Sequence, residues 1–238
     1  MKYLIVNGDD LGASPGINRG ILEAHHRGIL TSASLMVNAA GARDAADLSR
    51  SAPRLSVGLH ADITLPSAET GAAAPQEDTW RAELDSQLAR FQELMGRPPT
   101  HLDSHHNVHR DPRLLPVFLE CAGRHRLPLR EHSPVRYFSK FYGQWGGRTH
   151  LEQISVANLD RMLAAEIGEG FTELSCHPGY VEDDFASGYL RERRAEVQTL
   201  CEPGARRLLD LYGIRLISYH DLPGLLKDRP APGALTAA

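Results

Sequence analysis

Two adjacent carboxylates, Asp9 and Asp10, follow an apolar run near the start of the sequence. At the end of a buried strand they would repel each other and lose hydration unless a cation or hydrogen-bond donors compensated them. A helix N-cap or a solvated turn before Ser14 would require only one of them. Successive side chains on a strand point in opposite directions unless the chain bends, so we expect one aspartate to be a metal ligand and the other a base.

Histidines end or follow three further apolar segments: His60 ends SVGLH, His105 lies in HLDSHHNVH, and His177 follows FTELSC. His60 and His105 could join Asp10 in a set of one oxygen and two imidazole ligands. Such a set is typical of Zn²⁺ or another divalent first-row ion, and with several waters it could hold Mg²⁺. The alternative for any one histidine is a core ring with a satisfied hydrogen bond. The spacing also differs from the HExxH pattern of zinc proteases.

His177 and two further residues could support this chemistry. A Pro-Gly turn follows His177 and would expose its ring, which suits a general acid near neutral pH. Arg130 could orient a carboxylate such as Asp9, or it could form a surface ion pair. Asp103 could orient an imidazole, or it could be an ordinary loop carboxylate.

The elements that must position these residues alternate between short apolar segments and segments of helical period, which predicts a parallel sheet covered by helices. The predicted strands are Lys2–Gly8, Ser32–Asn38, Ser56–His60, His101–His105, Leu127–Glu131, Phe171–His177 and Ile214–Tyr219. The predicted helices are Ile17–Arg27, Ala42–Ser51, Trp80–Met95, Arg113–His125, Val156–Ile167 and a longer stretch around Leu190–Tyr212. A doubly wound sheet is possible, but seven strands fit a distorted or incomplete (β/α) TIM-like barrel better. Either fold gathers the ends of its strands into one active site.

Two predicted connections are long, Ala61–Asp78 and Ser133–Ser155, and the second contains Tyr137 and Trp145 among its aromatic residues. Long connections in a compact domain are usually functional or disordered. The aromatic faces could stack on a sugar ring, or they could form a dimer contact or pack in the core.

Length and composition limit the class of protein. With 238 residues we expect a single domain over residues 1–225, followed by a flexible tail over residues 226–238. The net charge of −4, with scattered basic residues, argues against nucleic acid or an anionic membrane as the main partner. The N-terminus reaches acidic residues too soon for a signal peptide or a membrane span. Three widely spaced cysteines fit a reducing compartment, so we expect a cytoplasmic protein.

The segments VNGDDLG, VGLH, THLDSHHNVH and SCHPGY, in this order, resemble the YdjC-like (ChbG/HpnK) carbohydrate deacetylases. The resemblance implies a distorted barrel, a divalent metal (Zn or Mg) and often a homodimer. It implies Asp10, His60 and His105 as metal ligands, Asp9 as the base and His177 as the acid. Asn107 departs from the pattern, because many relatives have another histidine there.

We therefore predict a metal-dependent hydrolase that removes an N-acetyl group from an amino sugar, such as a chitooligosaccharide, with a metal-activated water as nucleophile. Arg130 is predicted to assist catalysis, and the expected substrate contacts are Asp103, His106, Asn107, Tyr137 and Trp145. The alternatives are a hopanoid-pathway deacetylase of an N-acetylglucosamine lipid and a metal-dependent phosphoesterase, which often holds two metals. A non-catalytic carbohydrate-binding protein is a further alternative, against which the intact acidic and histidine residues speak.

Overall fold

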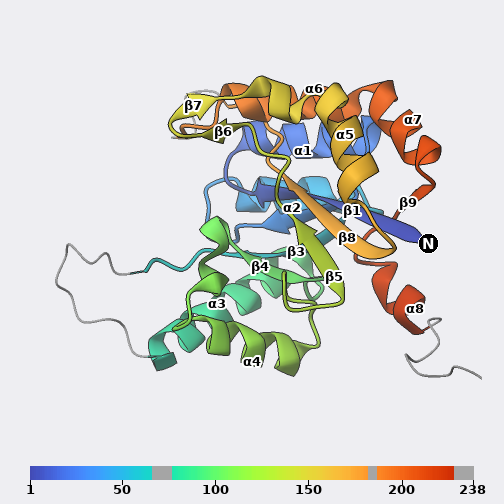
Figure 1. Ribbon diagram of the computed structural model, residues 1–238. Coiled ribbons are helices and arrows are strands. Elements are labelled where there is room, and N and C mark those ends of the chain that lie inside the picture. The colour runs from blue at the N-terminus through green and yellow to red at the C-terminus, as the bar shows by residue number, and fades with distance from the viewer. Residues whose placement is uncertain (66–76, 182–186, 228–238) are drawn as a thin grey trace, which may run out of the picture.

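A computed structural model describes residues 1–65, 77–181 and 187–227. A curled parallel sheet lies at its centre with helices packed around it (Figure 1). Within the described residues, the main sheet contains seven strands: β1 (Lys2–Leu11), β2 (Ser32–Leu35), β3 (Ser56–Ala61), β4 (Leu102–Ser104), β5 (Val135–Phe138), β8 (Gly170–Cys176) and β9 (Ile214–Leu216). This arrangement confirms the predicted α/β class and the incomplete TIM-like barrel.

Strand β1 is the centre of the sheet. The order is β4-β3-β2-β1-β8-β5, and every pair is parallel. Strand β9 pairs with the first residues of β1, on the same side of β1 where β2 pairs with its last residues. All but the first two residues of β1 are buried, because helices cover one side of the sheet and the barrel interior lies on the other. The carboxyl ends of these parallel strands therefore point toward one end of the molecule.

The predicted strand over Leu127–Glu131 is wrong, although its residues lie where such a strand would be. Leu102 donates its N–H to the carbonyl of Pro128, and Arg130 donates its N–H to the carbonyl of Leu102. Only one isolated bridge, Leu102 with Leu129, is formed, because Pro128 has no N–H and the left-handed Glu131 (φ 64°) turns the chain away. This segment nearly closes the barrel beside β4 and delivers Arg130 into its interior.

The segment predicted as a long aromatic loop is structured. It contains β5, which pairs with β8, and a short antiparallel hairpin of β6 (Gln144–Trp145) and β7 (Arg148–Thr149). A 3₁₀ turn over Leu151–Ile154 follows this hairpin.

The helices agree with most of the predicted ranges. They are α1 (Pro15–Arg27), α2 (Ala42–Arg50), α3 (Glu77–Met95), α4 (Leu115–His125), α5 (Val156–Glu166), α6 (Arg191–Cys201), α7 (Pro203–Leu211) and α8 (Leu222–Lys227). In the view of Figure 1, α1, α5 and α6 lie above the sheet and α3 and α4 below it. The first helix begins as its sequence indicates, since the Ser14 hydroxyl accepts the N–H of Ile17 and Pro15 takes the first helical position.

Most boundaries shift by about one to three residues from the predicted ranges, and two helical regions differ more. The stretch around Leu190–Tyr212 divides into α6 and α7, because Pro203 disfavours a helical conformation at Glu202, which is extended (ψ 128°). Helix α8 continues to Lys227, so the first two residues of the predicted tail over residues 226–238 are helical, and the rest lie outside the described residues. No helix within the described residues is long and apolar enough to cross a lipid bilayer.

Candidate active site

A bulge at the end of β1 turns both aspartates toward the same cavity. The register between β1 and β2 shifts between Gly8 and Leu11, and Asp10 adopts a left-handed backbone conformation with φ 68°. Such a bulge breaks the alternation of a regular strand and re-aims a side chain. Asp9 and Asp10 therefore both line the cavity, at 4% and 2% exposure. A residue other than glycine is strained in the left-handed backbone conformation, and such strain is common at functional sites.

Asp10 meets the two histidines that the sequence analysis grouped with it. Its Oδ1 lies 3.3 Å from Nε2 of His60 and 3.1 Å from Nδ1 of His105, and one donor atom from each residue lies within 4.8 Å of the others. His60 comes from β3 and His105 from the turn after β4, so three strand ends contribute. One carboxylate oxygen and two imidazole nitrogens on one side of a cavity are a donor set for a divalent cation.

The surroundings of His60 also fit a metal ligand. Its other ring nitrogen, Nδ1, lies 2.7 Å from Oδ1 of Asp103, and Asp103 is held by a hydrogen bond from the Ser34 hydroxyl (2.6 Å). A carboxylate behind an imidazole fixes the ring and its tautomer, so that the opposite nitrogen is aimed at a cation. Burial lowers the pKa of His60, but Asp103 and Asp10 outweigh it and raise the pKa to about 10. These carboxylates therefore favour positive charge at this position.

Asp9 is held by a buried arginine. Arg130 donates two hydrogen bonds to its carboxylate, at 2.9 and 2.8 Å, and Asn7 donates a third at 2.8 Å. The same guanidinium lies 2.7 Å from both Asp103 and Glu173, so it compensates three carboxylates that are almost fully buried. Arg130 itself is 2% exposed and does not line the cavity. It is thus placed to position Asp9 and is out of reach of a substrate.

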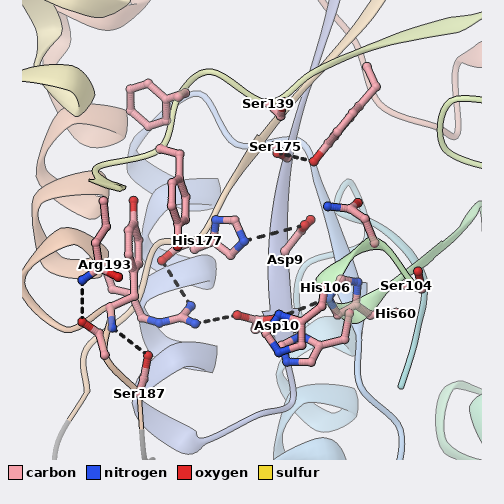
Figure 2. A pocket seen from close by; sticks show the side chains of 18 of the residues that line it. Asp9, Asp10, His60, Ser104, His106, Ser139, Ser175, His177, Ser187 and Arg193 are labelled. Carbon is pink, nitrogen blue, oxygen red and sulfur yellow. Dashed lines mark hydrogen bonds and ion pairs between the residues drawn. The ribbon is translucent and has the colours of Figure 1, made fainter. Parts of the chain in front are cut away.

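His177 follows β8 and faces Asp9 across the cavity (Figure 2). Its Nε2 lies 3.9 Å from Oδ2 of Asp9, and its Nδ1 has no hydrogen-bond partner among the described residues. Burial lowers the pKa of His177, against the opposing effect of Asp9 and Asp10. A protonated His177 would therefore give up its proton more readily than an ordinary imidazolium would.

Helix α6 contributes two buried residues that the sequence analysis missed. Arg193 donates to Oδ2 of Asp10 at 2.5 Å and to the carbonyl of His177 at 3.3 Å. Glu196 accepts the backbone N–H of His177 and the Tyr189 hydroxyl. In the sequence these charges lie within RERRAE, which has the composition of a solvated helix face, so no signal marked them as buried. Figure 2 shows Arg193 reaching Asp10 from the side opposite His60.

The cavity has a volume of about 630 Å³ and contains some of the predicted substrate contacts but not others. His106, Asn107 and Tyr137 line it. His106 and Asn107 both have left-handed backbone conformations (φ 54° and 52°), and Oδ1 of Asn107 is buried without a hydrogen-bond partner among the described residues. Tyr137 bonds to the Ser175 hydroxyl at 3.0 Å and lies over Arg130.

Two predicted substrate contacts do not line the cavity, and the burial of Asp103 corrects the prediction for that residue. Asp103 is 0% exposed and lies behind His60, where it orients the imidazole and cannot touch a substrate. Trp145 is half-exposed, and its ring stacks on His150 with centroids 3.6 Å apart on the β6–β7 hairpin. The strand ends therefore bring together the predicted acid, base and ligands, whereas Trp145 of the aromatic segment is not among the residues that line the cavity.

Comparisons with known proteins find relatives that match most of this chain. A family model described as YdjC-like protein matches residues 3–211. The chain is 38% identical to a carbohydrate deacetylase from Geobacillus stearothermophilus, over 92% of this chain and 98% of that protein. It is 34% identical to a chitooligosaccharide deacetylase from Proteus mirabilis, with the same coverage.

A solved structure is similar over nearly the whole fold. It is the crystal structure of a candidate cellobiose-phosphate cleavage protein from Enterococcus faecalis, with a TM-score of 0.81 and 29% identity. The match covers 93% of this chain and 98% of that one.

Proposed function

The chain belongs to the YdjC-like protein family, and from this membership and the geometry of its cavity we propose that it is a metal-dependent carbohydrate N-deacetylase. The reaction would be hydrolysis of an N-acetyl group on an amino sugar, releasing acetate and a free amine. The single observation that carries the proposal is the convergence of Asp10, His60 and His105 on one point, beside a facing pair of Asp9 and His177.

Asp10, His60 and His105 would hold one divalent ion, and two imidazoles favour zinc over magnesium. When bound, such an ion supplies a Lewis acid that activates water and polarises the acetamide carbonyl. The chain itself orients these ligands. Asp103 fixes the His60 ring, and Arg193 occupies Oδ2 of Asp10, which leaves Oδ1 directed at the two imidazoles.

Asp9 is the proposed general base. Its carboxylate is held from one side by Arg130 and Asn7, and it still lines the cavity. It would take a proton from the attacking water as the new C–O bond forms. Because Arg130 fixes both oxygens, the base would need little reorganisation during the reaction.

His177 is the proposed general acid. The amide C–N bond can break only if the departing nitrogen receives a proton, because an amide anion is a very poor leaving group. His177 Nε2, which faces Asp9, would donate this proton, so that acetate and the free sugar amine leave. On the substrate side, Oδ1 of Asn107 is a buried acceptor suited to a sugar hydroxyl, and His106 and Tyr137 would line the same binding site.

A two-metal phosphoesterase is less well supported. A second group of possible ligands contains Asp9, His60 and Asp103. Both of its carboxylates are already paired with the Arg130 guanidinium. A second cation there would have to displace a buried arginine. The donor set therefore favours one metal per chain.

The proposal also covers the substrate, the cellular location and the assembly. We favour a chitooligosaccharide because the similar protein from Proteus mirabilis is a chitooligosaccharide deacetylase. All three cysteines are free thiols, which suits the reducing cytoplasm. A homodimer follows from the family resemblance alone, and a sedimentation measurement would test it.

The experiment that tests the function measures acetate release from N-acetylated chitooligosaccharides and phosphate release from sugar phosphates, side by side. The protein is expected to release acetate and not phosphate, and a chelator should abolish the activity. His60→Ala is the matched control for a contaminating hydrolase. Phosphate release that requires His60, without acetate release, would contradict the proposal.

A further inference from the structure

A stacked pair of aromatic rings lies next to His177 and takes no part in the proposed chemistry. Tyr142 and Tyr189 both line the cavity, with ring centroids 4.6 Å apart and planes 5° from parallel. Tyr142 also meets the His177 ring edge to face, with centroids 5.7 Å apart. One face of Tyr142 is thus covered by Tyr189, and the ring borders the proposed general acid.

The ring pair is anchored. The Tyr189 hydroxyl donates to Glu196 at 2.5 Å and accepts the backbone N–H of Gly143 at 2.7 Å. Gly143 is the neighbour of Tyr142 in sequence, so one hydroxyl ties both segments together. Tyr189 is buried, whereas Tyr142 is 38% exposed. A ring fixed before binding loses little conformational freedom when a ligand stacks on it.

Polar side chains lie near this pair of rings. Gln144 and Ser187 line the same cavity. Gln144 donates to the carbonyl of Gly188 at 2.8 Å, and the Ser187 hydroxyl accepts the N–H of Tyr189 at 3.0 Å, so both lie next to the ring pair. A flat apolar ring with side-chain amide and hydroxyl groups beside it matches a sugar, which has an apolar C–H face and a rim of hydroxyls.

We propose that Tyr142 is the platform on which the amino-sugar ring that carries the cleaved amide stacks. The inference rests on the proposed function, because His177 must reach the amide nitrogen and the sugar ring bonded to that nitrogen must then lie beside His177. Among the described aromatic residues that line the cavity, Tyr142 is the exposed one. Phe141 is buried, and Tyr137 is partly buried over Arg130.

This assignment replaces Trp145 as the aromatic contact in this segment. Trp145 is more exposed than Tyr142, but its ring is stacked on His150 and it is not among the residues that line the cavity. Tyr142 and Trp145 are three residues apart, so the two assignments can be separated by single substitutions.

The test compares Tyr142→Ala, Tyr142→Phe and Trp145→Ala with the unmodified protein. Leu211→Ala, which truncates an exposed apolar side chain on α7, is the control for general surface effects. The measurements are KM and kcat for acetate release from N-acetylglucosamine and its dimer and trimer. In parallel, calorimetry gives the dissociation constants of the same sugars in an Asp9→Asn background, where turnover does not interfere.

Loss of one aromatic stacking contact predicts that Tyr142→Ala raises both KM and the dissociation constant by about five- to twentyfold, with a much smaller change in kcat. Tyr142→Phe keeps the ring and should restore most of the binding. The inference is overturned if Tyr142→Ala binds and cleaves like the unmodified protein, if only kcat falls, or if Trp145→Ala has the larger effect on binding. Unmodified protein that binds the sugars but does not cleave them would contradict the proposed function alone. Unmodified protein that does neither would contradict both.

Discussion

Replacing Asp9 by asparagine separates catalysis from metal binding and from folding. The substitution keeps the shape of the side chain and removes its basicity. Loss of a positioned general base lowers kcat by about 10²–10⁴-fold, equivalent to roughly 3–5 kcal/mol in the barrier. Asp9 is not one of the three proposed ligands, so the metal content should stay at that of the unmodified protein.

The cost in stability can be worked out from the contacts of Arg130. After the substitution, this guanidinium still lies 2.7 Å from both Asp103 and Glu173, so it is not left unpaired. The loss is therefore that of one charge-assisted interaction, about 1.5–3 kcal/mol. For a chain of this length, the melting temperature should fall by roughly 3–12 °C.

The assay combines acetate release, elemental analysis and thermal unfolding on one preparation. Asp210→Asn, a change of the same type at an exposed position on α7, is the control. Asp9→Asn protein with full metal content and near-native kcat would refute the base assignment. Loss of the metal together with activity would instead make Asp9 a ligand.

Three further changes test other parts of the site. His60→Ala leaves only Asp10 and His105 and should lower the metal content well below one per chain by elemental analysis; unchanged content would remove His60 from the ligand set. Arg130→Met removes the guanidinium that pairs with three buried carboxylates and should lower the free energy of unfolding by about 3–5 kcal/mol. A loss below about 1 kcal/mol in urea unfolding would mean that water replaces the guanidinium. Burial raises the pKa of Glu196 to about 8 from an ordinary 4.5. Between these two pH values the folded protein keeps a proton on Glu196 that the unfolded chain releases. The free energy of unfolding therefore falls as the pH rises through this range. Glu196→Gln should therefore lose less stability than the unmodified protein between pH 5 and pH 8, and equal slopes would contradict the raised pKa.

The sequence was sufficient to predict the fold class and the members of the site that lie at strand ends. The residues that end or follow the strands of a parallel sheet lie at the same edge of the sheet. His60, His105 and His177 could therefore be grouped from the sequence. The relation between Asp9 and Asp10 could not be predicted, because it depends on a bulge and a left-handed residue that the strand pattern does not indicate.

The supporting residues were harder to predict. Arg193 and Glu196 lie on a helix whose charged composition is typical of an exposed face, and only the packing of α6 against the strand ends makes them buried. Asp103 contacts the His60 ring, in line with one of its two expected roles, and its burial behind His60 excludes the other, a substrate contact. For the aromatic segment, the sequence left a sugar contact, a dimer contact and core packing open, and of the two rings expected to contact substrate only Tyr137 lines the cavity.

The central claim, catalysis by a single divalent ion held by Asp10, His60 and His105, is tested most directly by titrating chelator-stripped protein with zinc while measuring acetate release from an N-acetylated chitooligosaccharide. We expect activity to rise in proportion to added metal and to reach a plateau at one equivalent per chain. Acetate release by the metal-free protein, or a plateau that requires a second equivalent, would contradict this account.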